Sequence, residues 1–241
     1  DVSGNGFVPT NKLALDGGSD MYVATVQGDL DFVKLESWYV GMQDTFNTYT
    51  LAATSKIDLA ENANLGLEAR YVSLTLDNDY KNGLNSNLEK DNGMFRLAVD
   101  GKFSIVNARL AYTKTDKDGG LTALDQDAKN TSLGWNITSN GVADADYFQA
   151  ALGADILDNL NFTAHYGNLE ADATDKITVT NLVHGNLFDK KLEQEEIYGQ
   201  LTYKMSKNLS TYLRYGQFEQ KIDGDKNIDQ NMGRLQVAYT F

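Results

Sequence analysis

Apolar and polar residues alternate in short stretches along most of the chain. The last ten residues show this well: Leu235, Val237, Tyr239 and Phe241 fall on one face of an extended segment, and their neighbours are polar or small. Successive side chains of a β-strand point to opposite faces, so a period of two predicts strands that are apolar on one side. Eleven such segments are predicted, at 21–29, 32–42, 48–58, 65–76, 93–103, 105–116, 147–157, 160–170, 195–205, 209–221 and 232–241.

The connections between these segments are of two kinds. Short turns are expected near 28–29, 61–62, 104, 158–159 and 206–208, and long polar loops at about 77–92, 117–146, 171–194 and 222–231. Outer-membrane barrels show such alternation, with short periplasmic turns and longer extracellular loops. A Greek-key sandwich has no reason to keep it. The prediction is therefore an all-β fold, a transmembrane antiparallel β-barrel.

The composition supports a barrel and argues against other classes. The 241 residues include 13 tyrosines, no cysteine and one proline, Pro9, which precedes the first predicted strand. Proline would interrupt the hydrogen-bond ladder of a closed barrel, and tyrosine suits the boundary between lipid and water. Without cysteine there is no disulfide and no thiolate metal site. The net charge of -13 argues against nucleic acid as a partner.

The number of strands predicts what lies at the N-terminus. If the segment 232–241 ends in the periplasm, the segment 21–29 runs inward and residues 1–20 form an extracellular loop. Bacterial single-chain barrels have even strand numbers. Eleven strands therefore favour one barrel domain, 1–241, that lacks its N-terminal strands and belongs to a larger barrel. An additional hairpin at 177–189 is the alternative that stays open.

Charged residues within the predicted strands gather on the polar face. An unpaired charge that faces hydrocarbon costs roughly 2–4 kcal/mol at the bilayer midplane, so these side chains are expected to face a water-filled lumen. One interpretation is a basic constriction wall led by Arg96 and Arg109, and the other is charges paired across strands with little effect on permeation. The candidate pore-lining residues are Arg70, Arg96, Arg109, Arg214, Arg234, Lys34, Lys56, Lys204, Glu36, Glu68 and Asp100.

One segment has part of a calcium-loop pattern. Asp223, Asp225 and Asn227 match its start, but Ile228 stands where the loop needs glycine and Arg234 where it needs glutamate. The pattern therefore fails as a calcium-binding loop. No cofactor is expected, and only loosely bound surface calcium stays open.

The candidates for catalysis are few. His165 and Asp155 lie on adjacent predicted strands, and His184, the other histidine, lies in a predicted loop without an evident partner. A hydrolase needs a positioned nucleophile or activated water beside its base, and the chain has no Gly-x-Ser-x-Gly motif. We therefore expect no catalytic residues and no enzymatic activity.

Five short motifs occur in a characteristic order. They are Leu67-Glu68-Ala69-Arg70-Tyr71, Gly153-Ala154-Asp155, Lys190-Lys191-Leu192-Glu193, Tyr203-Lys204 before a Ser-x-x-Leu turn, and the ending Arg234-Leu235-Gln236-x-x-Tyr239-x-Phe241. In this order and spacing the chain resembles the Campylobacter-type major outer membrane porins over most of 21–241, although loops 117–146 and 171–194 do not match. The resemblance implies an 18-stranded barrel in the bacterial outer membrane, and a homotrimer in contact with lipid and lipopolysaccharide. It also implies that the inward-folded constriction loop lies outside the sequence present here.

The predicted function is passive diffusion of small hydrophilic solutes and ions, and the resemblance implies a preference for cations. Alternatives are another outer-membrane barrel, such as a substrate-specific channel, an adhesin or a secretion pore, and a soluble all-β binding protein. A mouth lined with one sign of charge concentrates counter-ions, whereas an arginine wall would favour anions. The acidic residues expected at the mouth are Asp77, Asp79, Glu89, Asp91, Asp116, Asp118, Asp125, Asp127, Asp223, Asp225 and Asp229.

Overall fold

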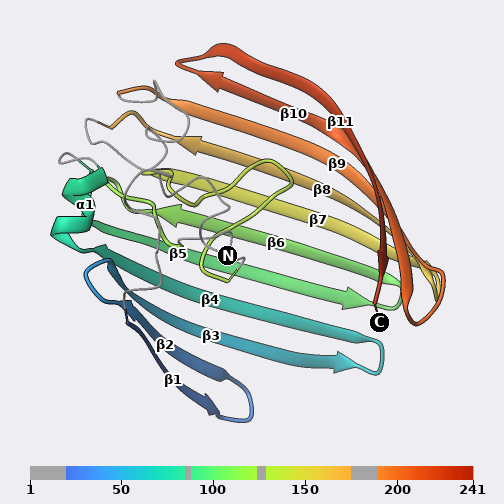
Figure 1. The fold of residues 1–241 in the computed structure, drawn as a ribbon. Coiled ribbons are helices and arrows are strands. Elements are labelled where there is room, and N and C mark those ends of the chain that lie inside the picture. The colour runs from blue at the N-terminus through green and yellow to red at the C-terminus, as the bar shows by residue number, and fades with distance from the viewer. Residues whose placement is uncertain (1–19, 85–87, 124–128, 175–188, 241) are drawn as a thin grey trace.

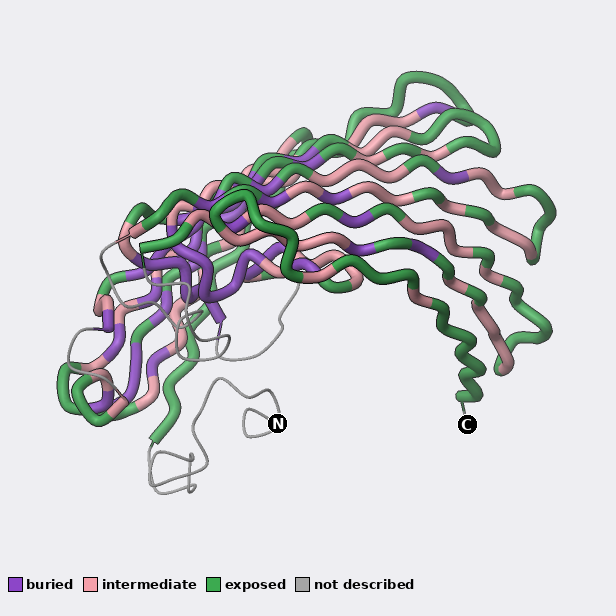
Figure 2. The backbone as a smooth tube through the Cα atoms, turned by 90° about the horizontal axis from the view of Figure 1, so that it is seen from above, coloured by how far each residue is buried: buried purple, intermediate pink, exposed green. Residues whose placement is uncertain are grey.

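A computed structural model describes residues 20–84, 88–123, 129–174 and 189–240. These residues form one antiparallel sheet in which each strand pairs with the next strand along the chain (Figure 1). The sheet is curved (Figure 2), and residues 116–123 and 129–144 lie against its concave side (Figure 1). Strands β1 and β11 form the two edges of the sheet and do not pair with each other in the described residues.

All eleven predicted strands are present, and the all-β antiparallel fold is confirmed. Their bounds agree closely with those predicted, except that β11 begins earlier. The elements are β1 (Met21–Asp29), β2 (Lys34–Met42), β3 (Phe46–Ala60), β4 (Ala63–Leu76), α1 (Asn78–Leu84), β5 (Asp91–Phe103), β6 (Val106–Thr115), β7 (Ala145–Leu157), β8 (Leu160–Ala171), β9 (Leu192–Lys204), β10 (Leu209–Ile222) and β11 (Asp225–Tyr239).

The predicted short turns lie at one end of the sheet, which we call the short-turn end. At the opposite, long-loop end, two connections begin and end close to where they were predicted, and a third, between β4 and β5, contains α1, which the sequence pattern did not predict. The long loop expected at 222–231 is wrong. Asp223 and Gly224 have φ angles of 53° and 83°, as a two-residue hairpin turn requires, so β10 and β11 continue to the turn. The possible hairpin at 177–189 falls almost entirely outside the described residues.

The pairing of strands assigns each side chain to a face. Residues directly opposite one another on paired strands share a face, and Arg70 pairs with Arg96, Asp100 with Arg109, and Arg214 with Arg234. These five arginines lie on the concave face. The convex face carries the apolar set, including Leu97, Leu110, Leu213 and Val237, which are 45%, 52%, 55% and 64% exposed. The predicted alternation of polar and apolar faces is confirmed.

The convex face also carries a set of tyrosines. Their strand partners assign all of them to that face: Tyr22, Tyr49, Tyr71, Tyr112, Tyr166, Tyr203, Tyr215 and Tyr239. Such side chains suit an interface between lipid and water. No helix among the described residues is long and apolar enough to cross a membrane.

Buried residues gather where the 116–144 connection covers the concave face (Figure 2). One cluster joins Ile137 and Val142 of this connection to Tyr147, Leu169 and Leu192 on the adjoining strands. A second cluster joins Leu121 to residues of β3, β4 and α1. The apolar core of this open sheet therefore lies between the sheet and one long connection.

Candidate functional site

The described residues of the connection between β6 and β7, which are 116–123 and 129–144, are called the inward segment. It is closed on itself by buried hydrogen bonds. The side-chain oxygen of Asn140 accepts from the backbone N–H groups of Thr122 and Ala123 at 2.9 and 3.1 Å. Thr115 Oγ1 donates to the carbonyl of Val142 at 2.7 Å. The described part of the segment is therefore a packed structure against the sheet.

Glu196 of β9 fixes the middle of the inward segment. Its residue is 2% exposed, and its two carboxylate oxygens accept hydrogen bonds from the backbone N–H groups of Trp135 and Asn136, each at 2.8 Å. A Cβ atom at Gly134 would lie 1.8 Å from Glu196 Oε1. This close approach favours glycine, because a side chain there would force either the carboxylate or the segment to move and so break their contact.

Arg96 of β5 fixes a second part of the inward segment. Its Nη1 donates to the carbonyl of Thr131 at 2.9 Å, and its Nη2 donates to the carbonyl of Lys129 at 3.1 Å. The remaining donors bind Glu68 Oε1, at 3.0 Å from Nε and 2.8 Å from Nη2. Arg96 is only 6% exposed. Its side chain therefore supports the segment and is covered by it.

Glu68 of β4 is shared by three arginines. Its Oε1 accepts from Arg70 Nε at 3.1 Å as well as from Arg96, and its Oε2 lies 3.7 Å from Arg109 Nη2. Asp100 binds Arg109 from the next strand at 2.6 Å. At this part of the concave face the basic side chains are paired across neighbouring strands, which was one of the two interpretations of the sequence.

The arginines of β10 and β11 have a different environment. The Cζ atom of Arg214 lies 5.0 Å from the ring centroid of Trp135 and 4.9 Å from that of Tyr198, and Gln200 accepts hydrogen bonds from its Nε and Nη2 at 2.9 and 2.6 Å. Arg234 Cζ lies 5.9 Å from the Trp135 centroid. Among the described residues no carboxylate oxygen lies within 4.0 Å of either guanidinium. Aromatic rings and an amide thus surround this pair.

The other predicted lining residues lie on the concave face toward the short-turn end. Lys34 lies 3.6 Å from Asp29, and Lys56 lies 3.6 Å from Asp58, with all four side chains well exposed. Glu36 accepts from Trp38 Nε1 at 3.3 Å. Lys204 is directly opposite Ser210 of β10, so its side chain also lies on the concave face. All eleven predicted residues thus share one face, and their role in lining a pore stays a prediction.

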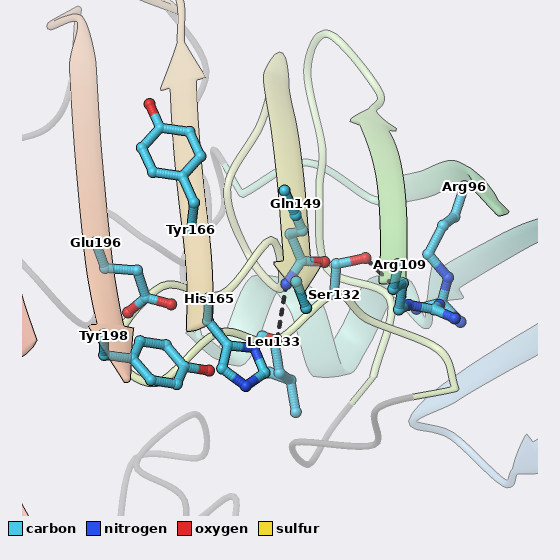
Figure 3. Close-up of a pocket in the computed structure, with 12 residues that line it drawn as sticks. Arg96, Arg109, Ser132, Leu133, Gln149, His165, Tyr166, Glu196 and Tyr198 are labelled. Atoms are coloured by element: carbon cyan, nitrogen blue, oxygen red, sulfur yellow. Dashed lines mark hydrogen bonds between the residues drawn. The ribbon is translucent and has the colours of Figure 1, made fainter. Parts of the chain in front are cut away.

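A cavity of about 290 Å³ lies between the inward segment and the sheet. Figure 3 shows Arg109, Gln149, His165 and Tyr198 around it, with Gln149 Nε2 donating to the carbonyl of Leu133 at 2.9 Å. Its lining is mixed in polarity and comes from the sheet and the inward segment together. The inward segment therefore leaves a cavity between itself and the strands of the sheet.

The histidine and aspartate considered for catalysis are not brought together. His165 pairs with Ala151 of β7, whereas Asp155 pairs with Asn161, so four residues, roughly 13 Å, separate their levels along the strand. His165 stacks on Tyr198 with centroids 4.5 Å apart, and Asp155 lies 3.4 Å from Lys102. Among the described residues there is also no group of three His, Cys, Asp or Glu side chains that could hold a metal ion. His184 lies outside the described residues.

The sequence did not predict the inward segment or the residues that hold it. The resemblance implied that the family's constriction loop lies outside this sequence, which stays a prediction, and it gave no reason to expect that residues 116–123 and 129–144 lie against the concave face. The available signals were Trp135, one of the two tryptophans of the chain, in a loop that also contains apolar residues, and Glu196, a carboxylate on the polar face of a strand. Neither signal specifies its partner, because the two lie about 60 residues apart in the chain.

Similar folds occur among known outer-membrane proteins. The chain superposes on OprD from Pseudomonas aeruginosa with a TM-score of 0.68, at 17% identity, covering 92% of this chain and 58% of that one. For OccAB3 from Acinetobacter baumannii the TM-score is 0.63, at 16% identity, covering 92% and 55%. The chain thus spans less than two thirds of the length of these proteins, and the likeness concerns the fold. No curated protein sequence matches the chain.

The sequence matches a family over almost its whole length. The model of the Campylobacter major outer membrane protein matches residues 5–241. Together with the barrel-like sheet, this match identifies the compartment as the bacterial outer membrane. The chain belongs to the Campylobacter major outer membrane protein family.

Proposed function

We propose that this chain forms part of the wall of a water-filled channel through which small hydrophilic solutes and ions diffuse across the outer membrane. The observation that carries the proposal is the opposite polarity of the two faces. Charged and amide side chains line the concave face, and exposed Leu, Val, Phe and Tyr side chains cover the convex face. Charges in hydrocarbon are costly, so the concave face is the one suited to water.

The inward segment would narrow this channel. Glu196 and Arg96 hold it against the concave face through its own backbone. A loop that crosses a lumen reduces the space open to solutes. Of the eleven charged residues named above, Arg70, Arg96 and Glu68 would support the segment from beneath. The other eight would line the part of the lumen that stays open.

A preference for cations belongs to this proposal. Most of the predicted acidic residues that are described lie in connections at the long-loop end, and Asp91, Asp225 and Asp229 lie in the ends of strands there. Asp125 and Asp127 lie outside the described residues. A predominantly acidic mouth would concentrate cations before they enter. Part of this charge is offset locally, because Lys226 lies 2.8 Å from Asp229.

The proposal extends to the assembly. Among the described residues, β1 and β11 each have one neighbouring strand, and an open sheet edge cannot face lipid. We therefore propose that further strands close the sheet into a barrel of 16–18 strands, and that the barrel is a homotrimer in contact with lipid and lipopolysaccharide. Residues 1–19, most of the proposed first extracellular loop, lie outside the described residues. Loosely bound calcium at the acidic connections also stays a proposal.

Conductance across planar lipid bilayers tests the channel. The purified protein should produce stepwise, ohmic conductance that grows with salt concentration, as a water-filled pore requires. A protein that inserts and stays folded but conducts no ions would overturn the proposal and favour an adhesin. Saturable inhibition by one solute would favour a substrate-specific channel.

A further inference from the structure

We propose that Arg214 and Arg234 form a binding site for the carboxylate of a small organic anion on the concave face. The two arginines are directly opposite each other on β10 and β11. Like charges directly opposite on neighbouring strands destabilise a sheet. An anion between the two guanidinium groups would remove this repulsion. The inference rests on one part of the proposed function, namely that the concave face is in contact with water.

The same chain contains a second pair of opposite arginines that shows what such a pair binds. Arg70 and Arg96 are directly opposite on β4 and β5, and Glu68 Oε1 accepts from both, at 3.1 and 2.8 Å. Glu68 lies on the concave face two residues from Arg70, toward the short-turn end. An intrinsic carboxylate thus occupies the bridging position of this pair.

Beside the Arg214–Arg234 pair, the position that corresponds to Glu68 carries no carboxylate. Two residues from each arginine toward the short-turn end lie Tyr212 and Gln236, which are opposite each other. Tyr212 donates its hydroxyl hydrogen to Gln236 Oε1 at 2.7 Å. An amide and a phenol therefore stand at the level where the first pair has Glu68, and the two positive charges keep no counter-charge among the described residues.

The guanidinium groups keep donors for a ligand. Gln200 accepts hydrogen bonds from Nε and Nη2 of Arg214, and no described residue binds its Nη1. The guanidinium group of Arg234 lies against the Trp135 ring and makes no hydrogen bond to a described residue. Both arginines are also less covered than Arg96, Arg234 being exposed. Charge-assisted hydrogen bonds from guanidinium to carboxylate are short and strong. A carboxylate-bearing solute therefore fits the charge and the donors that are present.

Trp135 provides the measurement, because its ring contacts both guanidinium groups. The whole protein, including the proposed further strands, is folded in non-ionic detergent micelles. Trp38 and any tryptophan outside residues 1–241 are replaced by phenylalanine, which leaves Trp135 as the one tryptophan. Acetate, and separately succinate, replaces chloride at constant ionic strength while the emission is recorded. We expect a saturable change in emission with carboxylate that chloride does not produce.

Two variants locate the site. Arg234→Gln removes one guanidinium, and Gln236→Glu supplies an intrinsic carboxylate while keeping an acceptor for Tyr212. Each should weaken carboxylate binding at least about tenfold, as loss of a charge-assisted hydrogen bond predicts. Lys207→Gln, which removes a charge from the turn before β10, should change nothing. Circular dichroism checks that each variant is folded.

The outcomes separate this inference from the channel proposal. Absence of a saturable response, an equal response with chloride in place of carboxylate, or an unchanged affinity in folded Gln236→Glu would each overturn the site. None of these results depends on ion conduction. A protein that binds acetate but does not conduct would retain the site and overturn the channel.

Discussion

Two pairs of directly opposite arginines occur on the same face, and they are stabilised in different ways. Arg70 and Arg96 lie beside or beneath the inward segment, share Glu68 and are each about 7% exposed in their side chains. Arg214 and Arg234 lie near the edge of the sheet, against aromatic rings and Gln200. Identical residues in identical pairing thus have a carboxylate partner in one place and none in the other.

The difference follows from access to water. Charges removed from water lose solvation and remain stable only when they are paired and hydrogen-bonded. Charges that keep contact with water remain stable without a partner from the chain. Where the inward segment covers the wall, the chain therefore supplies its own counter-charge; where the wall is open, solvent or solute ions can provide it.

Replacing Glu68 with Gln should have the largest effect on stability. The amide keeps the shape of the side chain but leaves the covered arginines without a counter-charge, and breaking such a buried pair costs about 3–5 kcal/mol. Chemical denaturation of the chain folded in micelles measures the free energy of unfolding. The matched control is Asp100→Asn, whose carboxyl side chain is 48% exposed and should contribute at most about 1 kcal/mol. Equal losses in the two variants would contradict the distinction between covered and open wall.

Detaching the inward segment should have the next largest effect. Glu196→Ala removes the acceptor of two backbone N–H groups, and leaving them unsatisfied should cost about 2–4 kcal/mol. The segment should then become sensitive to proteolysis within 129–136. Glu196→Gln retains one carbonyl acceptor and should be cleaved more slowly than Glu196→Ala. A Glu196→Ala protein as resistant as the unmodified chain would show that other contacts suffice.

How much of this could be predicted differs between the sheet and the segment that covers it. Strands such as β6 and β11 follow from local alternation, because the face on which Leu110 or Leu235 lies depends only on its neighbours along the chain. The error at 222–231 arose because Asp223-Gly224, a two-residue turn, is surrounded by polar residues that resemble a loop. The site depends on contacts between distant residues, such as Glu196 with Trp135, which no alternation records.

Removing one arginine of the open pair should change stability little. Arg234→Gln ends a like-charge contact worth roughly 0.2–1 kcal/mol, so the free energy of unfolding should stay equal or rise slightly. Arg70→Gln, by contrast, should lower it, since the covered Glu68 would lose a partner. The two variants are measured side by side in the same micelles. A substantial loss of stability in Arg234→Gln would mean that this arginine already has a strong partner.

Ion selectivity should show the smallest effect and the same asymmetry. In a dilute KCl gradient across a bilayer we expect the reversal potential to indicate a modest preference for cations, which should weaken as salt rises, because charges are screened beyond about 10 Å at 0.1 M. Arg234→Gln and Gln236→Glu remove positive charge or add negative charge at the open pair, so both should increase the preference, by about twofold, or roughly 0.4 kcal/mol. Lys207→Gln is a control for the loss of a cation elsewhere and should not change the preference for cations.

The charge of Arg70 is already offset by Glu68 within the wall, and Arg70→Gln should therefore shift the reversal potential less than Arg234→Gln. An equal shift in the two variants would show that the field in the channel does not distinguish the paired arginines from the unpaired ones.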